Sequence, residues 1–109
     1  MRKTGISQNS ITISTEVFGW VFIIINMNTQ ELNIGLTLNP SKRITRISAA
    51  ERLVYYRGFT NPFDAIAHKH ILEELSKESI LHNVTQQNPN LKNLISEIQG
   101  KVKGEDTKD

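Results

Sequence analysis

Basic and aromatic side chains gather between residues 42 and 59, and they are the group best equipped for binding chemistry. Lysine and arginine neutralise phosphates, and tyrosine stacks on unpaired bases, so a nucleic-acid groove has its ingredients here. Tyrosine and arginine are also enriched at the hot spots of protein interfaces. The candidate binding residues are Lys42, Arg43, Arg46, Arg52, Tyr55, Tyr56, Arg57 and Phe59. The segment predicts a contact surface for a protein partner or for a nucleic acid.

A purely structural role for the same residues stays open. The aromatic side chains can pack the junction between two helices, while the arginines are solvated or pair with glutamates of the following helix. A helix, a glycine and a second helix also outline a helix-turn-helix. Asp64 then falls where that second helix would approach DNA, and its carboxylate would repel phosphate. Protein contacts are therefore the preferred function, and nucleic-acid binding is the alternative.

Histidines and glutamates offer no recognisable metal or catalytic pattern. His68 and His70, two residues apart on a predicted helix, would point about 200° apart around its axis. No H-E-x-x-H spacing and no cysteine accompanies them. Glu73 and Glu74 have an ion-pair partner in reach, since Lys77 lies four residues after Glu73. The chain is predicted to have no metal, no cofactor and no enzymatic activity.

Composition bounds the class of protein. The chain has 109 residues, of which 38% are hydrophobic and 22% charged, as in an ordinary small globular domain. The absence of cysteine excludes a disulfide scaffold and predicts a cytoplasmic location. The net charge of +2 is too small to indicate nucleic acid by itself. Residues 41–58 carry five basic side chains against one acidic, whereas residues 63–82 carry two against four, which favours a polar partner surface.

The beginning of the chain is unlike the rest. Residues 17–25 form an apolar run of nine, and because a bilayer span needs about 20, no transmembrane span is expected. Their β-branched and aromatic content favours a buried strand if the segment is ordered, with a helix as the alternative. A second hypothesis makes Met27 the natural start and residues 1–26 upstream translation. Residues 32–38 alternate apolar and polar side chains and predict a half-buried strand.

Three helices are predicted from start and stop signals. Ser48 and Glu51 have the spacing of a capping box, which together with Gly58 predicts a helix over 49–57. Asn61 followed by Pro62 predicts a helix from 62 to about 82, and the pair at 88 and 89 predicts a third helix that ends at Gly100.

These patterns together predict a mainly α fold, a small three-helix domain with an extended or short β N-terminal segment. Residues 1–26 would be an atypical segment, not native or disordered, 27–47 extended or strand, 48–99 the helical domain and 100–109 a flexible tail. The predicted core comprises Leu53, Val54, Phe63, Ile66, Ile71, Leu72, Leu75, Leu91, Leu94, Ile95 and Ile98. So small a core leaves an apolar stripe uncovered, so we expect a homodimer. The expected function is that of a non-enzymatic regulatory or adaptor protein.

Overall fold

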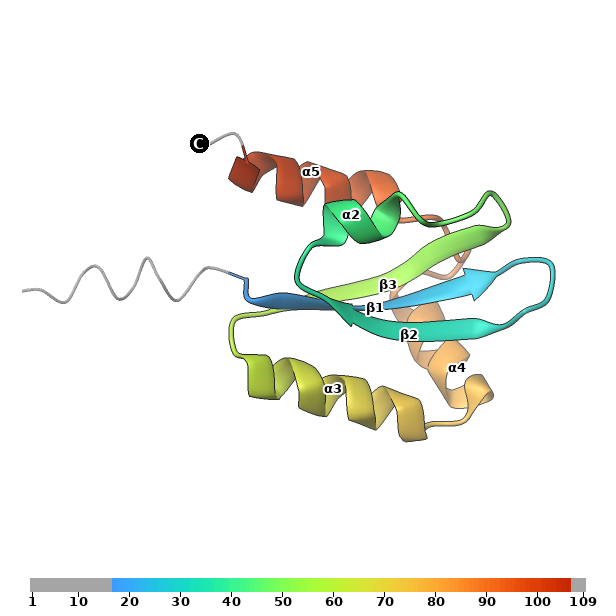
Figure 1. Ribbon diagram of the computed structural model, residues 1–109. Coiled ribbons are helices and arrows are strands. Elements are labelled where there is room, and N and C mark those ends of the chain that lie inside the picture. Colours follow the sequence, from blue (N-terminus) through green and yellow to red (C-terminus); the bar gives the residue numbers. More distant parts are fainter. Residues whose placement is uncertain (1–16, 107–109) are drawn as a thin grey trace, which may run out of the picture.

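A three-stranded antiparallel sheet with helices on both faces forms the fold (Figure 1). The computed structural model describes residues 17–106, except the side chains of 102–106. The strands are β1 (Gly19–Asn26), β2 (Leu32–Thr37) and β3 (Glu51–Phe59), in the spatial order β2-β1-β3. The helices are α2 (Pro40–Ile44), α3 (Pro62–Glu74), α4 (Lys77–Gln87) and α5 (Ile95–Asp106). The fold is mixed α/β, so the prediction of a mainly α, three-helix domain is wrong.

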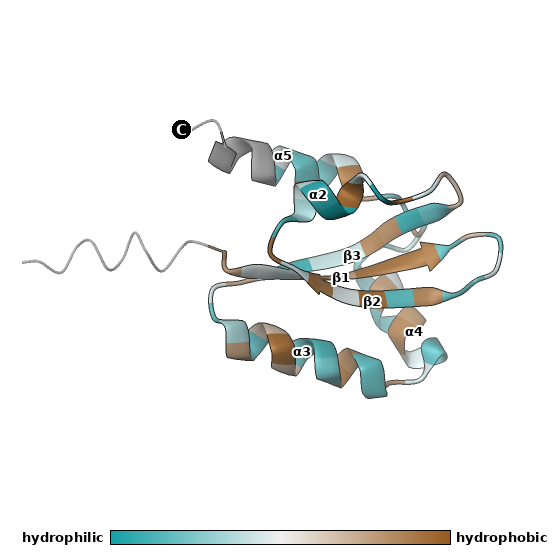
Figure 2. Cartoon of the chain, viewed as in Figure 1, coloured by the Kyte–Doolittle hydropathy of each residue, from teal (hydrophilic) through white to brown (hydrophobic). Residues whose placement is uncertain are grey.

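The first strand, β1, is the centre of the molecule. Antiparallel pairing joins it to β2 on one side and to β3 on the other, and every residue from Gly19 to Ile25 is buried. A strand covered on both faces needs apolar side chains at every position, and the apolar run supplies them (Figure 2). The prediction of a buried strand in this segment is confirmed.

The sheet divides the core into two clusters because neighbouring side chains of a strand point to opposite faces. Val21, Ile23 and Ile25 pack on the face that α3 and α4 cover. Trp20, Phe22 and Ile24 pack on the opposite face, together with Leu53 and Ile98, under α2 and α5. Among residues 17–106, no helix is long and apolar enough to cross a bilayer.

The helix predicted over 49–57 is the strand β3. The expected contact within its capping box does form, since the Glu51 carboxylate accepts a hydrogen bond from the Ser48 backbone N–H at 2.9 Å, but it closes a turn. Beyond the turn, pairing with β1 overrides the local signal. A β-bulge opposite Ile23 and Ile24 places Val54 and Tyr55 on one face, which breaks the alternation that identifies a strand.

The later helices are placed partly as predicted. The Asn61 side chain caps α3 by accepting hydrogen bonds from the next two available backbone N–H groups, which confirms that start. The helix stops at Glu74, however, because Leu75 is extended and Ser76 caps a new helix, α4. Asn88 ends α4 instead of starting a helix, and α5 continues through Gly100.

The inner face of α3 differs from the predicted one. The residues that pack against the sheet are Ala65 and Leu72. Phe63, Ile66 and Ile71 were expected in the core, but their exposed fractions are 77%, 46% and 60%. Small Ala65 allows the helix to lie close to the sheet, and the larger side chains then face away from it. The helix consequently has apolar residues on two faces.

Candidate functional site

The structure separates the predicted binding residues into three places. Lys42 and Arg43 belong to α2, and Arg46 follows that helix. Tyr56 on β3 packs on the face of the sheet that α2 covers. Tyr55 and Phe59 pack against the cluster on the other face. The eight predicted residues therefore do not form one groove.

The other two predicted arginines, Arg52 and Arg57, both lie on β3. Arg52 donates a hydrogen bond to the Leu91 backbone carbonyl at 3.1 Å and so fastens a loop. Arg57 stands over the ring of Phe59, with 4.9 Å between its guanidinium carbon and the ring centroid. Arg52 is used structurally, whereas the Arg57 charge stays available for a ligand.

A basic group, Lys42, Arg43 and Arg46, lies on and after α2. Asn39 caps this helix by accepting a hydrogen bond from the Lys42 backbone N–H at 3.1 Å. The guanidinium of Arg43 lies 5.1 Å from the centroid of the Phe22 ring. The ion pairs of the described residues all lie on α3, so no carboxylate neutralises this basic group there. Its position suits contact with an anionic partner.

Gly35 leaves room for the Phe22 ring that Arg43 contacts. Gly35 on β2 is the cross-strand partner of Phe22 on β1. A Cβ at this glycine would lie 2.3 Å from the Phe22 Cζ, far inside van der Waals contact. Only glycine at this position therefore leaves space for the Phe22 ring, over which the Arg43 guanidinium lies.

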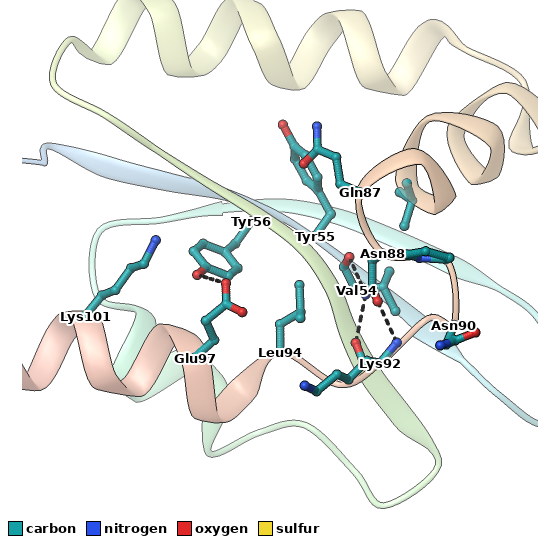
Figure 3. Close-up of a pocket in the computed structure, with 12 residues that line it drawn as sticks. Val54, Tyr55, Tyr56, Gln87, Asn88, Asn90, Lys92, Leu94, Glu97 and Lys101 are labelled. Carbon is teal, nitrogen blue, oxygen red and sulfur yellow. Dashed lines mark hydrogen bonds between the residues drawn. The ribbon is translucent and has the colours of Figure 1, made fainter.

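A cavity of about 520 Å³, the β3-edge pocket, opens between β3, the loop after α4 and α5 (Figure 3). Asn88 is its structural anchor, with an exposed fraction of 8%. Its side-chain amide donates to the carbonyls of Val54 and Lys92 at 3.2 and 2.9 Å, and its side-chain oxygen accepts from the Lys92 N–H at 2.9 Å. One buried side chain thus joins the loop to the edge of β3.

Tyr56 contacts two charged side chains of α5 at the mouth of the β3-edge pocket. The Tyr56 hydroxyl donates a hydrogen bond to the Glu97 carboxylate, and the Lys101 ammonium lies 5.2 Å from the centroid of the Tyr56 ring (Figure 3). Burial and the neighbouring Glu97 raise the pKa of Tyr56 well above its usual value. The raised pKa keeps the Tyr56 phenol protonated at neutral pH.

A second cavity, of about 390 Å³, lies between α3 and α4 on the opposite side of Tyr55; we call it the α3–α4 pocket. The Tyr55 hydroxyl and the His68 Nε2 are 2.8 Å apart and share a hydrogen bond. The ring of Phe59 lies 5.2 Å from that of His68 and also supports Arg57. Burial, and then the charge of Arg57, lower the pKa of His68. The imidazole is therefore neutral at pH 7.

The sequence did not indicate this pocket because its lining residues come from four separate elements, β1, β3, α3 and α4. His68 has no metal-ligand or catalytic spacing in the sequence, so no pattern there assigns it to a site. Reading residues 55, 57 and 59 with strand periodicity would have placed Tyr55, Arg57 and Phe59 on one face. That alternation was the one available signal.

The lowered pKa of His68 predicts a pH-dependent stability. The unfolded-state pKa is near 6.5, and the folded-state pKa is lower, so protonation disfavours the folded protein. This contribution is complete above pH 6.5 and is lost as the pH falls through 6.5 towards the folded-state pKa. Between pH 7.5 and 5.5 His68 should lower the unfolding free energy of the wild type by under about 1 kcal/mol, since solvent screens a partly exposed group. His68→Gln should lack this decrease. Urea unfolding at both pH values measures it.

His82→Gln is the matched control, because His82 is exposed on α4. It should leave the pH dependence of the unfolding free energy as in the wild type. An equal flattening of that dependence by both variants would contradict the assignment to His68.

Carboxylates and histidines do not converge elsewhere on the described surface. Glu73 on α3 pairs with Lys69 at 2.6 Å and lies 3.9 Å from the His70 ring. Residues 17–101 contain no group of three or more histidines and carboxylates able to hold a metal.

Comparison of the chain with protein-family models, curated proteins and solved structures finds no match. No relative therefore supplies a function.

Proposed function

We propose that this chain is a non-enzymatic regulatory or adaptor protein that acts through protein contacts, with the outer face of α3 as its contact surface. The observation that carries this proposal is the exposure of Phe63, Ile66 and Ile71 on one helix, while its inner face already packs on the sheet. Large apolar side chains gathered on the surface of a small protein favour a contact with another protein. A cytoplasmic location belongs to the same proposal.

A second copy of the chain suits this face. Phe63 and Ile71 each lie four residues from Ala67, about 12 Å apart along the helix axis. If two α3 helices pair antiparallel about Ala67, each Phe63 meets the Ile71 of the other copy, and Asp64 stands opposite His70. Small Ala67 at the twofold axis lets the helices approach closely. A twofold pairing uses the same patch twice, as closed dimers require.

The expected affinity is modest. Fully burying a large apolar side chain contributes about 1.5–3 kcal/mol, and these side chains are already partly covered. Association itself costs at least about 4 kcal/mol in lost freedom of motion. We therefore expect a dimer with a dissociation constant in the micromolar range, equivalent to about −8 kcal/mol.

Sedimentation velocity of the full chain from about 0.1 to about 100 μM tests the proposal, since this range brackets the expected dissociation constant. The wild type should shift from monomer towards dimer. Ile71→Lys should hold the protein monomeric, because it places two charges against the apolar contact. Ser96→Lys, an exposed change on α5, is the charge-matched control and should behave as the wild type. A single monomeric wild-type species at the highest concentration would exclude self-association.

Nucleic-acid binding is the second candidate, and the basic group at α2 favours it. Lys42, Arg43 and Arg46 occur within five residues, and no ion pair joins them to a carboxylate among residues 17–101. Three phosphate contacts predict that log K falls with log salt at a slope of about −2 to −3. Fluorescence anisotropy of labelled single-stranded and duplex oligonucleotides with the full chain measures that slope.

Variants assign any binding to this group. Arg43→Gln should reduce the affinity for every sequence and make the salt slope shallower by about 1. Lys77→Gln removes an exposed cation of α4 and should change neither quantity. Absence of binding at low salt would eliminate the nucleic-acid candidate and leave the protein-contact proposal untouched.

A further inference from the structure

The α3–α4 pocket has the form of a small-ligand site, and its position on the inner side of α3 makes it independent of the proposed dimer face. Its floor consists of aliphatic side chains from the sheet and both helices, among them Ile23, Leu72 and Val84. Arg57 and His68 line it together with the amide side chains of α4. A volume of about 390 Å³ falls within the range of small-molecule pockets.

We propose that this pocket binds a small carboxylate with an apolar body, its carboxylate on Arg57 and its body on the aliphatic floor. The Phe59 ring holds the guanidinium in place, which lowers the entropic cost of ordering it around a ligand. None of the residues that line the pocket is acidic, and Arg57 makes no ion pair with a described residue. An unneutralised guanidinium beside an apolar floor favours a ligand that carries both kinds of group.

The charge of the pocket distinguishes a carboxylate from a phosphate. Arg57 is the one permanent cation of the lining, and Asn83, Gln86 and Gln87 add only neutral donors. His68 contributes no charge at pH 7, because its pKa is lowered by burial and by Arg57. One positive charge matches a carboxylate, whereas inorganic phosphate carries more than one negative charge at neutral pH. The planar fork of the guanidinium also matches the two oxygens of a carboxylate.

Nuclear magnetic resonance of the full chain, titrated with hexanoate at fixed ionic strength, tests the proposal. Hexanoate should bind saturably with millimolar affinity and shift the signals of Tyr55, Arg57 and His68. Acetate, which lacks the apolar body, and inorganic phosphate should each bind at least about tenfold more weakly. Bound carboxylate should also raise the pKa of His68, because a nearby anion favours the imidazolium. The backbone amide signals of His70 and His82 should not shift with ligand.

Arg57→Gln should weaken hexanoate binding about tenfold or more, because it removes the charge-assisted hydrogen bonds. Lys77→Gln removes an exposed cation at the start of α4 that does not line the pocket, and it should bind as the wild type. The amide spectrum of each variant verifies that it is folded, and Arg57→Lys should restore part of the affinity if Arg57→Gln disturbs the fold. Phosphate binding tighter than hexanoate, shifts away from the pocket, unchanged binding by Arg57→Gln, or no saturable shift would each overturn the proposal.

Discussion

A chain that begins at Met27 is expected to remain unfolded. It lacks β1, the strand that pairs with both others and contributes to both core clusters. The strand buries six large apolar side chains, each contributing about 1.5–3 kcal/mol, so its loss removes on the order of 10–20 kcal/mol. A domain of this size has a total stability of roughly 5–15 kcal/mol. Circular dichroism and amide spectra of residues 27–109, against the full chain, measure the difference.

Ile24→Ala in the full chain provides a graded control. This buried residue lies in the middle of β1, and its truncation should reduce the free energy of unfolding by about 2–5 kcal/mol. A cooperatively folded 27–109 chain would contradict the central place of β1. Such a result would agree with the hypothesis that Met27 is the natural start, because a product that begins there must fold without β1.

Asn88→Ala is expected to lower the unfolding free energy by about 2–4 kcal/mol. It leaves the carbonyls of Val54 and Lys92 and the N–H of Lys92 without their partner, and a buried polar group left unpaired costs about 1–3 kcal/mol. Water entering the space left by the side chain replaces part of this loss, which keeps the expected value below the sum. Urea unfolding monitored by circular dichroism gives the change.

Two further variants test the hydrogen bonds themselves. Asn88→Asp keeps the acceptor for Lys92 but replaces the donating amide by oxygen, so it should destabilise the protein although its shape is retained. Asn90→Ala alters an exposed residue of the same loop and should cost under about 0.5 kcal/mol. If Asn88→Ala cost no more than Asn90→Ala, the hydrogen bonds of Asn88 would not hold the loop.

Local signals predicted the elements whose cause is local. Asn61 and Pro62 start α3 as expected, since the cap and the fixed backbone angle act within one turn. Ser48 and Glu51 form their expected contact as well, yet the same hydrogen bond is compatible with a turn that leads into a strand. The deciding partner of β3 is β1, some 30 residues earlier in the chain, and a local pattern contains no information about it.

The inner face of α3 was predicted wrongly because its largest apolar side chains do not face the sheet. Phe63, Ala67 and Ile71 form a regular stripe that resembles a core face, but the sheet accepts Ala65 and Leu72 instead. Periodicity shows that a helix has apolar stripes and does not show which one packs inward when there are two.

The candidate site was predicted in its residue types but not in its arrangement. Tyr55 and Tyr56 are adjacent in sequence, and the pleat of β3 sends them to different cores. Only long-range pairing brings His68 to Tyr55 and Glu97 to Tyr56. Residue types were therefore readable from the sequence, whereas the division into separate pockets required the sheet.

The central position of β1 affects how the protein is made. The ribosome releases this strand first, but one of its two neighbours, β3, emerges only after residue 59 has been added. Until then the nascent chain presents an apolar strand with one unpaired edge, the kind of segment that recruits other strands. Chaperone protection during synthesis, followed by rapid closure once β3 is released, is the expected biogenesis of such a fold.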